Sequence, residues 1–146
     1  MKTSFVLTMA IALAITAGAA AQTLKPPKGA VVGTFSRDCM LGCGDEELVR
    51  LLKVSNAWCK WDGEEFVVHL TLRNRSDAGI KVEVQPRYRI LRGGLHGDGF
   101  GSISDTHVDA RGFKSWYIVK GKPKGVKPGA RVTACIPRLY DVSADD

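Results

Sequence analysis

Alternation of apolar and polar residues constrains the fold of this chain more than any other feature. In EEFVVHLTLRN, every second residue is apolar and falls on one face of an extended strand, namely Phe66, Val68, Leu70 and Leu72. The side chain of His69 falls on the opposite face, where we expect it to meet solvent. The same alternation recurs in IKVEVQPRYRIL and ARVTACIPRLYDV. A period of two is typical of half-buried strands, so the sequence predicts a mainly β fold.

Turn signals separate the predicted strands at regular intervals. They lie in RNRSDAG, at Ala110–Gly112 within THVDARGFKSWYIVK, and in GKPKGVKPG. Pro86 interrupts one predicted strand and indicates a bulge or an edge position. RGGLHGDGFGSISD holds five glycines in fourteen residues and is predicted to form a long loop. Six or seven strands over residues 54–142, with a short acidic tail at 143–146 predicted to fray, favour an antiparallel β-sandwich.

A short helix is expected just before the sandwich. Acidic residues follow Gly44 and suit the positive end of a helix dipole, and leucines at 48, 51 and 52 share one helical face. These patterns predict a helix over Asp45–Lys53. The alternative is an early strand through LVRLLKV.

The beginning of the chain has the three parts of a secretory signal peptide. Lys2 precedes an apolar run from Phe5 to about Ala17, and an alanine-rich stretch ends at Gln22. The alternative is a membrane anchor, but the apolar run is shorter than the roughly 20 residues of a spanning helix. No cysteine lies at the predicted cut, which argues against a lipid anchor. Cleavage after residue 21 would leave 125 of the 146 residues as a secreted or periplasmic product of bacterial type, with no transmembrane segment.

The mature chain would hold four cysteines: Cys39, Cys43, Cys59 and Cys135. An even number in an exported chain predicts two disulfides. Four cysteines allow three pairings, and sequence alone does not choose among them.

The pieces FVVHLTLRNRS, IKVEVQPRYRI and DARGFKSWYIV resemble the small immunoglobulin-like modules of bacterial exported proteins, such as the FxLYD type, although the FxLYD residues themselves are absent. The resemblance implies an immunoglobulin-like fold, and such modules usually bind or space rather than catalyse. In that fold the first and last strands can run side by side. This implies a Cys59–Cys135 bridge, with Cys39 and Cys43 pairing locally within an extension over residues 22–53. Crossed pairings would instead attach the extension to the sandwich.

No motif predicts a metal, cofactor or redox site. CMLGC has three residues between its cysteines, whereas thioredoxin-like motifs have two, and a zinc site needs a second close ligand pair. Glu64 and Glu65 are strand neighbours that point to opposite faces, so they cannot flank one bond. GLHGDGFG lacks the Gly-Lys-Ser/Thr of a phosphate loop.

A hydrolase is the weakest of the functional alternatives. His96 and Asp98 lie among flexible glycines, and Ser102 or Ser104 would complete a nucleophilic set. No G-x-S-x-G stretch supports it. The stretch from His96 to Asp98 suits equally an inhibitor that inserts a rigid loop into the cleft of a secreted hydrolase.

Binding is the predicted activity. The net charge is +6, and the cations concentrate in two places. Basic patches attract anionic polymers, and an exposed tryptophan stacks on sugars or anchors a protein. The predicted contact residues are His96, Asp98, Lys120, Lys122, Lys124, Lys127, Arg87, Arg89 and Trp61. The predicted partner is an anionic cell-envelope polymer or an extracellular protein. Nucleic acid does not suit the compartment.

Overall fold

The computed structural model describes residues 25–39, 42–61, 63–92, 95–121 and 130–145, and it confirms a mainly β fold with antiparallel sheets, none of them closed. The predicted signal peptide lies outside these residues. The elements are β1 (Val31–Val32), α1 (Glu46–Leu51), β2 (Leu52–Trp61), β3 (Phe66–Asn74), β4 (Ile80–Gln85), β5 (Arg87–Arg92), β6 (Leu95–Phe100), β7 (Ser104–Val108), β8 (Phe113–Lys120), β9 (Arg131–Cys135) and β10 (Arg138–Ala144). Within the described residues, no helix combines the length and apolar character that spanning a bilayer requires.

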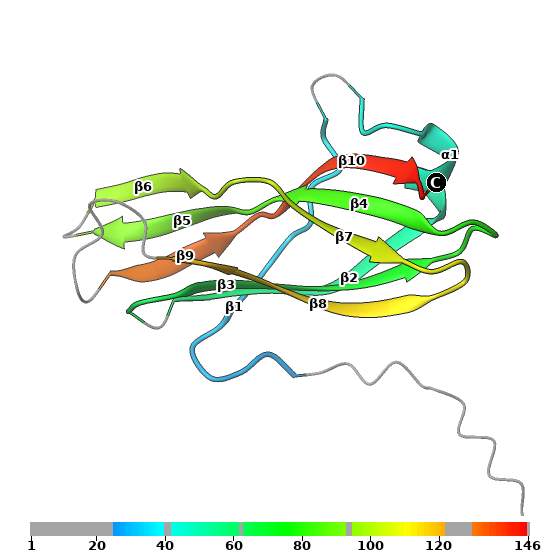
Figure 1. Ribbon diagram of the computed structural model, residues 1–146. Coiled ribbons are helices and arrows are strands. Elements are labelled where there is room, and N and C mark those ends of the chain that lie inside the picture. Colours follow the sequence, from blue (N-terminus) through cyan, green and yellow to red (C-terminus); the bar gives the residue numbers. More distant parts are fainter. Residues whose placement is uncertain (1–24, 40–41, 62, 93–94, 122–129, 146) are drawn as a thin grey trace, which may run out of the picture.

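The first layer is a four-stranded sheet with the order β1-β2-β3-β8 (Figure 1). All three pairings are antiparallel. Val68 on the central strand β3 lies opposite Cys59 on β2 and Ile118 on β8. The alternate residues that were predicted to face the core are fully buried.

The second layer contains two three-stranded sheets, with the orders β10-β4-β7 and β9-β5-β6. Only Pro86 separates β4 from β5, and breaks of two or three residues separate β9 from β10 and β6 from β7. Three long strands, each broken near its middle, therefore build this layer. Hydrogen bonds still cross the break, because the Gly101 and Ile136 N–H groups donate to the carbonyl oxygens of Pro86 and Arg87 at 2.9 and 2.8 Å. The breaks explain why the described residues form ten strands where six or seven were predicted.

The core lies between the two layers. Phe66 from the first layer packs against Tyr88 from the second, with ring centroids 4.1 Å apart. Full burial of a residue such as Leu70 or Ile80 stabilises the fold by roughly 1.5–3 kcal/mol. The buried apolar residues alternate along β3 and β4, and buried residues of β2 and β10 join the same cluster, so one continuous core holds the layers together.

The segment after β1 crosses from the first layer to the second. The Gly33 N–H donates to Ala57 in β2, and the Thr34 N–H donates to Cys135 in β9. Further along, Ser36 and Gly44 form parallel bridges with β10. Residues 33–39 and 42–44 thus cover an edge of the second layer that would otherwise present unpaired backbone groups.

The helix is shorter than predicted. Asp45 is its N-cap, and its carboxylate accepts the N–H groups of Glu47 and Leu48. The chain becomes extended at Leu52 and continues directly as β2. The helical pattern and the alternative strand through LVRLLKV were therefore each correct for part of the segment.

The prediction of a long loop over residues 92–105 is wrong. β6 pairs with β5 across this stretch, and β7 begins at Ser104. Gly99 lies opposite Tyr88, and a Cβ atom at Gly99 would collide with the Tyr88 ring. The glycine makes room for an aromatic cross-strand neighbour and does not mark a loop here.

The end of the chain is also more ordered than predicted. β10 continues to Ala144, whose partner is Ile80 on β4. The Asp145 N–H donates to the carbonyl oxygen of Gly79 at 2.9 Å. Residues 143–145 therefore belong to the sheet or its end, not to a frayed tail.

Both predicted disulfides are confirmed, with the local and long-range pairing implied by the resemblance. Cys59 lies on β2 and Cys135 on β9, so this bridge joins the two layers. Both cysteines are buried. Two disulfides fit the oxidising conditions outside the cytoplasm.

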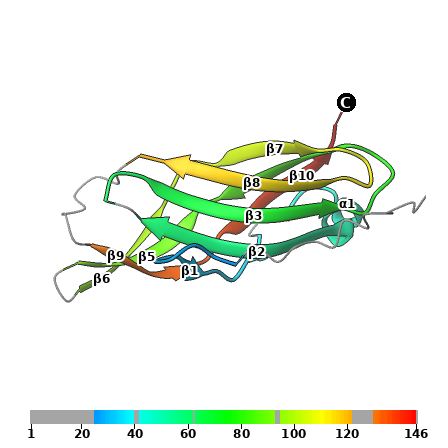
Figure 2. The same ribbon diagram turned by 90° about the horizontal axis from the view of Figure 1, so that it is seen from below.

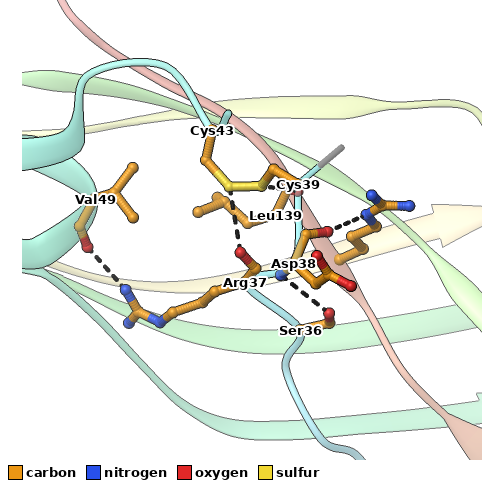
Figure 3. Close-up of a disulfide and its surroundings, with 8 residues drawn as sticks. Ser36, Arg37, Asp38, Cys39, Cys43, Val49 and Leu139 are labelled. Carbon is orange, nitrogen blue, oxygen red and sulfur yellow. Dashed lines mark hydrogen bonds between the residues drawn. A yellow bond between two sulfur atoms is a disulfide. The ribbon is translucent and has the colours of Figure 1, made fainter. Parts of the chain in front are cut away.

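The Cys39–Cys43 disulfide holds the crossing segment beside β10 (Figure 3). The Sγ atom of Cys39 lies 3.1 Å from the carbonyl oxygen of Leu139. The Arg37 guanidinium donates to the carbonyl oxygens of Val49 and Leu52 at 2.8 and 2.6 Å. The segment is therefore attached to β10, to α1 and to the start of β2.

Candidate binding face

The loop surface predicted from the basic residues is only partly described. Arg87 and Arg89 are exposed on β5, while Lys122, Lys124 and Lys127 lie outside the described residues. Lys120 ends β8, and its Nζ atom donates to the Ser102 hydroxyl at 2.9 Å. This contact assigns Ser102 a lysine partner.

The backbone of β6 places the other predicted loop residues. His96 lies opposite Leu91 and Asp98 lies opposite Arg89 on β5. Their side chains are outside the description, so their roles stay predictions. Ser104 lies on β7 opposite Val84.

Trp61 lies on the inner side of its sheet. It is half-buried, packs against the core, and lies opposite Phe66. Its indole nitrogen is buried and has no hydrogen-bond partner among the described residues. Trp58, on the opposite side of β2, is instead the tryptophan of the outer surface, although neighbours cover most of it.

The outward side of the β1-β2-β3-β8 layer forms a broader candidate surface, which we call the outer face. Figure 2 views the molecule from this side. The face carries the residues that alternate with the core residues of its strands: Val32, Lys53, Ser55, Trp58, Lys60, Val67, His69, Thr71, Arg73, Phe113, Ser115, Tyr117 and Val119.

Exposed apolar side chains concentrate on the outer face. Seven large hydrophobic residues are exposed in the described chain, and four of them are here: Val32, Phe113, Tyr117 and Val119. Three of these four come from β8, whose inward residues Trp116 and Ile118 also contact the core. A strand that is apolar on both sides and exposed on one is typical of a contact surface.

The charge on the outer face has one sign. Lys53 and Arg73 are cross-strand partners at one end of the face, and Lys60 lies at the other end, opposite Val67. The residues of the face include no Asp or Glu. An apolar surface bordered only by cations suits an anionic ligand.

His69 occupies the centre of the outer face and is fully buried, so the prediction of a solvated histidine is wrong. The Trp58 ring stacks on its imidazole, with centroids 5.1 Å apart and planes inclined by 18°. The Tyr117 ring lies 4.7 Å away on the next strand. Two aromatic side chains therefore cover an imidazole that strand alternation alone would place in solvent.

Both ring nitrogens of His69 have partners. Nδ1 lies 2.8 Å from the carbonyl oxygen of Asn56, and Nε2 lies 2.8 Å from the Ser115 hydroxyl. A carbonyl only accepts, so Nδ1 carries the hydrogen. In the neutral ring, Nε2 is then the acceptor and the Ser115 hydroxyl donates to it.

A β-bulge provides the carbonyl group for this arrangement. The β2–β3 register shifts between Ser55 and Trp58, and Asn56 there has φ = 50°. This left-handed conformation is uncommon outside glycine, and asparagine tolerates it better than most residues. The Asn-Ala pair before Trp58 was the sequence signal, and it was missed because the stretch was interpreted as a regular strand.

Another candidate surface lies on β10, in the second layer. A surface pocket beside the Cys39–Cys43 disulfide is lined mainly by backbone and side chains of β10. No cluster of three or more His, Cys, Asp or Glu residues suited to a metal ion occurs within the part of the chain that the structure describes. The outer face therefore combines more ligand-binding features than the pocket on β10.

No protein-family model matches this sequence, and neither a curated protein nor a solved structure matches it.

Proposed function

We propose that this protein is an exported, disulfide-stabilised binding module, without catalytic turnover, that attaches to an anionic polymer of the cell envelope through its outer face. Its two antiparallel layers correspond in this proposal to an immunoglobulin-like sandwich of the small bacterial exported type. The proposed location is secreted or periplasmic, after removal of residues 1–21.

The observation that carries the proposal is the composition of the outer face. Phe113 exposes 58% of its surface opposite the cation Arg73, and Tyr117 exposes 53% further along β8, opposite His69. Aromatic rings stack on sugar rings, and cations attract carboxylate or phosphate groups along a polymer. An acidic polysaccharide offers both kinds of group at once.

The mode of attraction predicts a salt dependence. Exposed charges are screened over about 8 Å at physiological ionic strength, so the ionic part of the binding weakens as salt is added. Stacking on Tyr117 and Phe113 is less sensitive to salt. We therefore expect affinity for an acidic polysaccharide to fall with salt without vanishing, whereas salt-resistant 1:1 capture of one secreted hydrolase would favour the inhibitor alternative.

Replacing Tyr117 with alanine is expected to weaken binding to an acidic polysaccharide about tenfold, since a stacked aromatic contributes roughly 1–3 kcal/mol. Titration of the polymer measured by fluorescence or calorimetry gives the affinity. Tyr140→Ala is the matched control, because Tyr140 is 51% exposed but lies on β10 in the other layer. Equal losses in the two variants would contradict the proposal.

A matched pair of arginine variants tests the charged part of the outer face. Arg73→Gln on the outer face and Arg87→Gln on β5 change the net charge equally. We expect Arg73→Gln to lower the affinity severalfold and to reduce its salt dependence, with little change for Arg87→Gln. The reverse result would move the contact to the second layer, around Arg87 at the start of β5.

A further inference from the structure

The proposed polymer binding makes no use of the hydrogen bond between Ser115 and His69. Ser115 is exposed, and its hydroxyl lies 2.8 Å from Nε2 of an imidazole that is fully buried. The Asn56 carbonyl fixes the ring from the other side at 2.8 Å. The hydroxyl of an exposed residue thus donates to a base that a third group orients.

This order of groups is what a serine nucleophile requires. A free serine hydroxyl is a weak nucleophile, and an adjacent base activates it by accepting its proton as the new bond forms. The base must present an unprotonated nitrogen to the hydroxyl, so its tautomer has to be fixed. Here the backbone carbonyl of Asn56 fixes the tautomer, as a carboxylate does in a catalytic triad.

The surroundings hold the imidazole in place. Trp58 stacks on the ring at 5.1 Å and Tyr117 packs against it at 4.7 Å. Rotation of the ring would break both hydrogen bonds and both ring contacts. The Nε2 lone pair is therefore directed at Ser115 before any ligand arrives, which is the preorganisation that catalytic groups need.

A positive charge lies near the hydroxyl by strand register. Ser115 pairs with Thr71, and Arg73 is two positions along β3 on the same face. Diagonal neighbours of this kind are about 7–8 Å apart, within reach of a long side chain. A guanidinium there would favour a substrate with an acidic group and the negative charge that develops on an attacked carbonyl oxygen.

Other hydroxyls in the described residues differ in their partners. Ser102 accepts a hydrogen bond from Lys120, and Ser36 accepts one from the Asp38 N–H. Ser76 is buried and donates to Asn74 and Ala78. Ser115 differs from these three in combining exposure with an imidazole acceptor.

The geometry points to Ser115 as a nucleophile that accepts the acyl group of an ester. Its Oγ attacks the ester carbonyl carbon while its proton moves to Nε2 of His69. The carbon–oxygen bond to the alcohol then breaks, and the departing oxygen takes the proton from Nε2. The products are acyl-Ser115 and a free alcohol, with no change in oxidation state. The step is a single acyl transfer onto the protein and not turnover, so it is compatible with a binding module. The inference goes beyond polymer binding and does not depend on it.

A fluorophosphonate probe tests the inference on the intact exported protein. Ser115 Oγ displaces fluoride from phosphorus, the proton passes to His69, and peptide mass mapping identifies the labelled residue. We expect label on Ser115 at a rate about 100-fold above that on Ser102, which matches the usual contribution of a general base. Wild-type protein that carries no label on Ser115, or labels both serines equally, would overturn the inference.

Two variants complete the test. Ser115→Ala removes the label. The binding proposal is tested by titrating the polymer onto the wild-type protein and not by labelling, so failure of the nucleophile and failure of the binding proposal remain distinguishable. His69→Gln lowers the labelling rate of Ser115 about 100-fold in protein that still unfolds cooperatively. If His69→Gln does not fold, the comparison of the labelling rates of Ser115 and Ser102 in the wild-type protein still tests the inference.

Discussion

Removing the Cys59–Cys135 disulfide is expected to lower the free energy of unfolding by about 4 kcal/mol, because the bridge closes a long loop in the unfolded chain. The two cysteines are 76 positions apart and join opposite layers through the core. The loss is comparable with the whole stability of a small domain, roughly 5–15 kcal/mol. Urea unfolding of the Cys59→Ala/Cys135→Ala protein measures it.

The second disulfide is the control for this prediction. Cys39 and Cys43 are only four positions apart, and their bridge lies at the surface edge of the second layer. From loop-closure entropy, we expect this disulfide to raise the free energy of unfolding by about 2 kcal/mol, which is half the effect of the longer loop. An equal or greater loss for Cys39→Ala/Cys43→Ala would show that loop closure does not govern stability here.

Asn74→Leu is expected to destabilise the fold by about 3 kcal/mol, because it strips partners from several buried polar groups. The Asn74 amide donates to the carbonyl oxygens of Ala78, Val108 and Asp109 at 2.7, 3.3 and 3.0 Å. Its oxygen accepts both the N–H and the hydroxyl of Ser76. One side chain therefore connects the turn after β3 to the end of β7.

Thermal unfolding of Asn74→Leu is expected to show a midpoint lowered by about 10 °C. The neighbouring Arg75→Leu is the control, because Arg75 is exposed and surface substitutions usually change stability by less than about 0.5 kcal/mol. Similar midpoints for the two variants would contradict the structural role of the Asn74 amide.

The core was predictable because burial and strand period act on the same residues. Phe66, Val68, Leu70 and Leu72 alternate without interruption, and all four are fully buried. The regular period also located the turn at 110–112, where Arg111 adopts φ = 55° and the Gly112 N–H donates to Asp109. Local sequence decides such features, so no knowledge of the other layer was needed.

Other features depend on contacts between distant segments. Gly99 is part of a strand because Tyr88, eleven residues earlier, covers it from β5. His69 is buried because Trp58 and Tyr117 approach it from the two neighbouring strands. Neither contact can be predicted from the residues adjacent in sequence. Gly99 lies among other glycines, which indicate a flexible loop, and the alternation around His69 indicates a solvent-facing position.

The candidate face was missed for a related reason. Period-two alternation identifies which side of a strand meets the core, but it does not say what the other side binds. In FKSWYIVK both sides of β8 carry apolar residues, and the outward ones, Phe113, Tyr117 and Val119, were the available signal. The glycine and lysine clusters that predicted the contact surface lie in part outside the described residues.

The most direct test of the binding account is a residue-resolved footprint on an acidic polysaccharide. Amide chemical shifts of the protein are followed while the polymer is added, with a neutral polysaccharide as the reference. The account predicts that shifts cluster on β3 and β8 around Arg73, Ser115 and Tyr117, and that they fade as salt is raised. Shifts confined to the β5–β6 end of the molecule, or the same shifts with the neutral polymer, would contradict it.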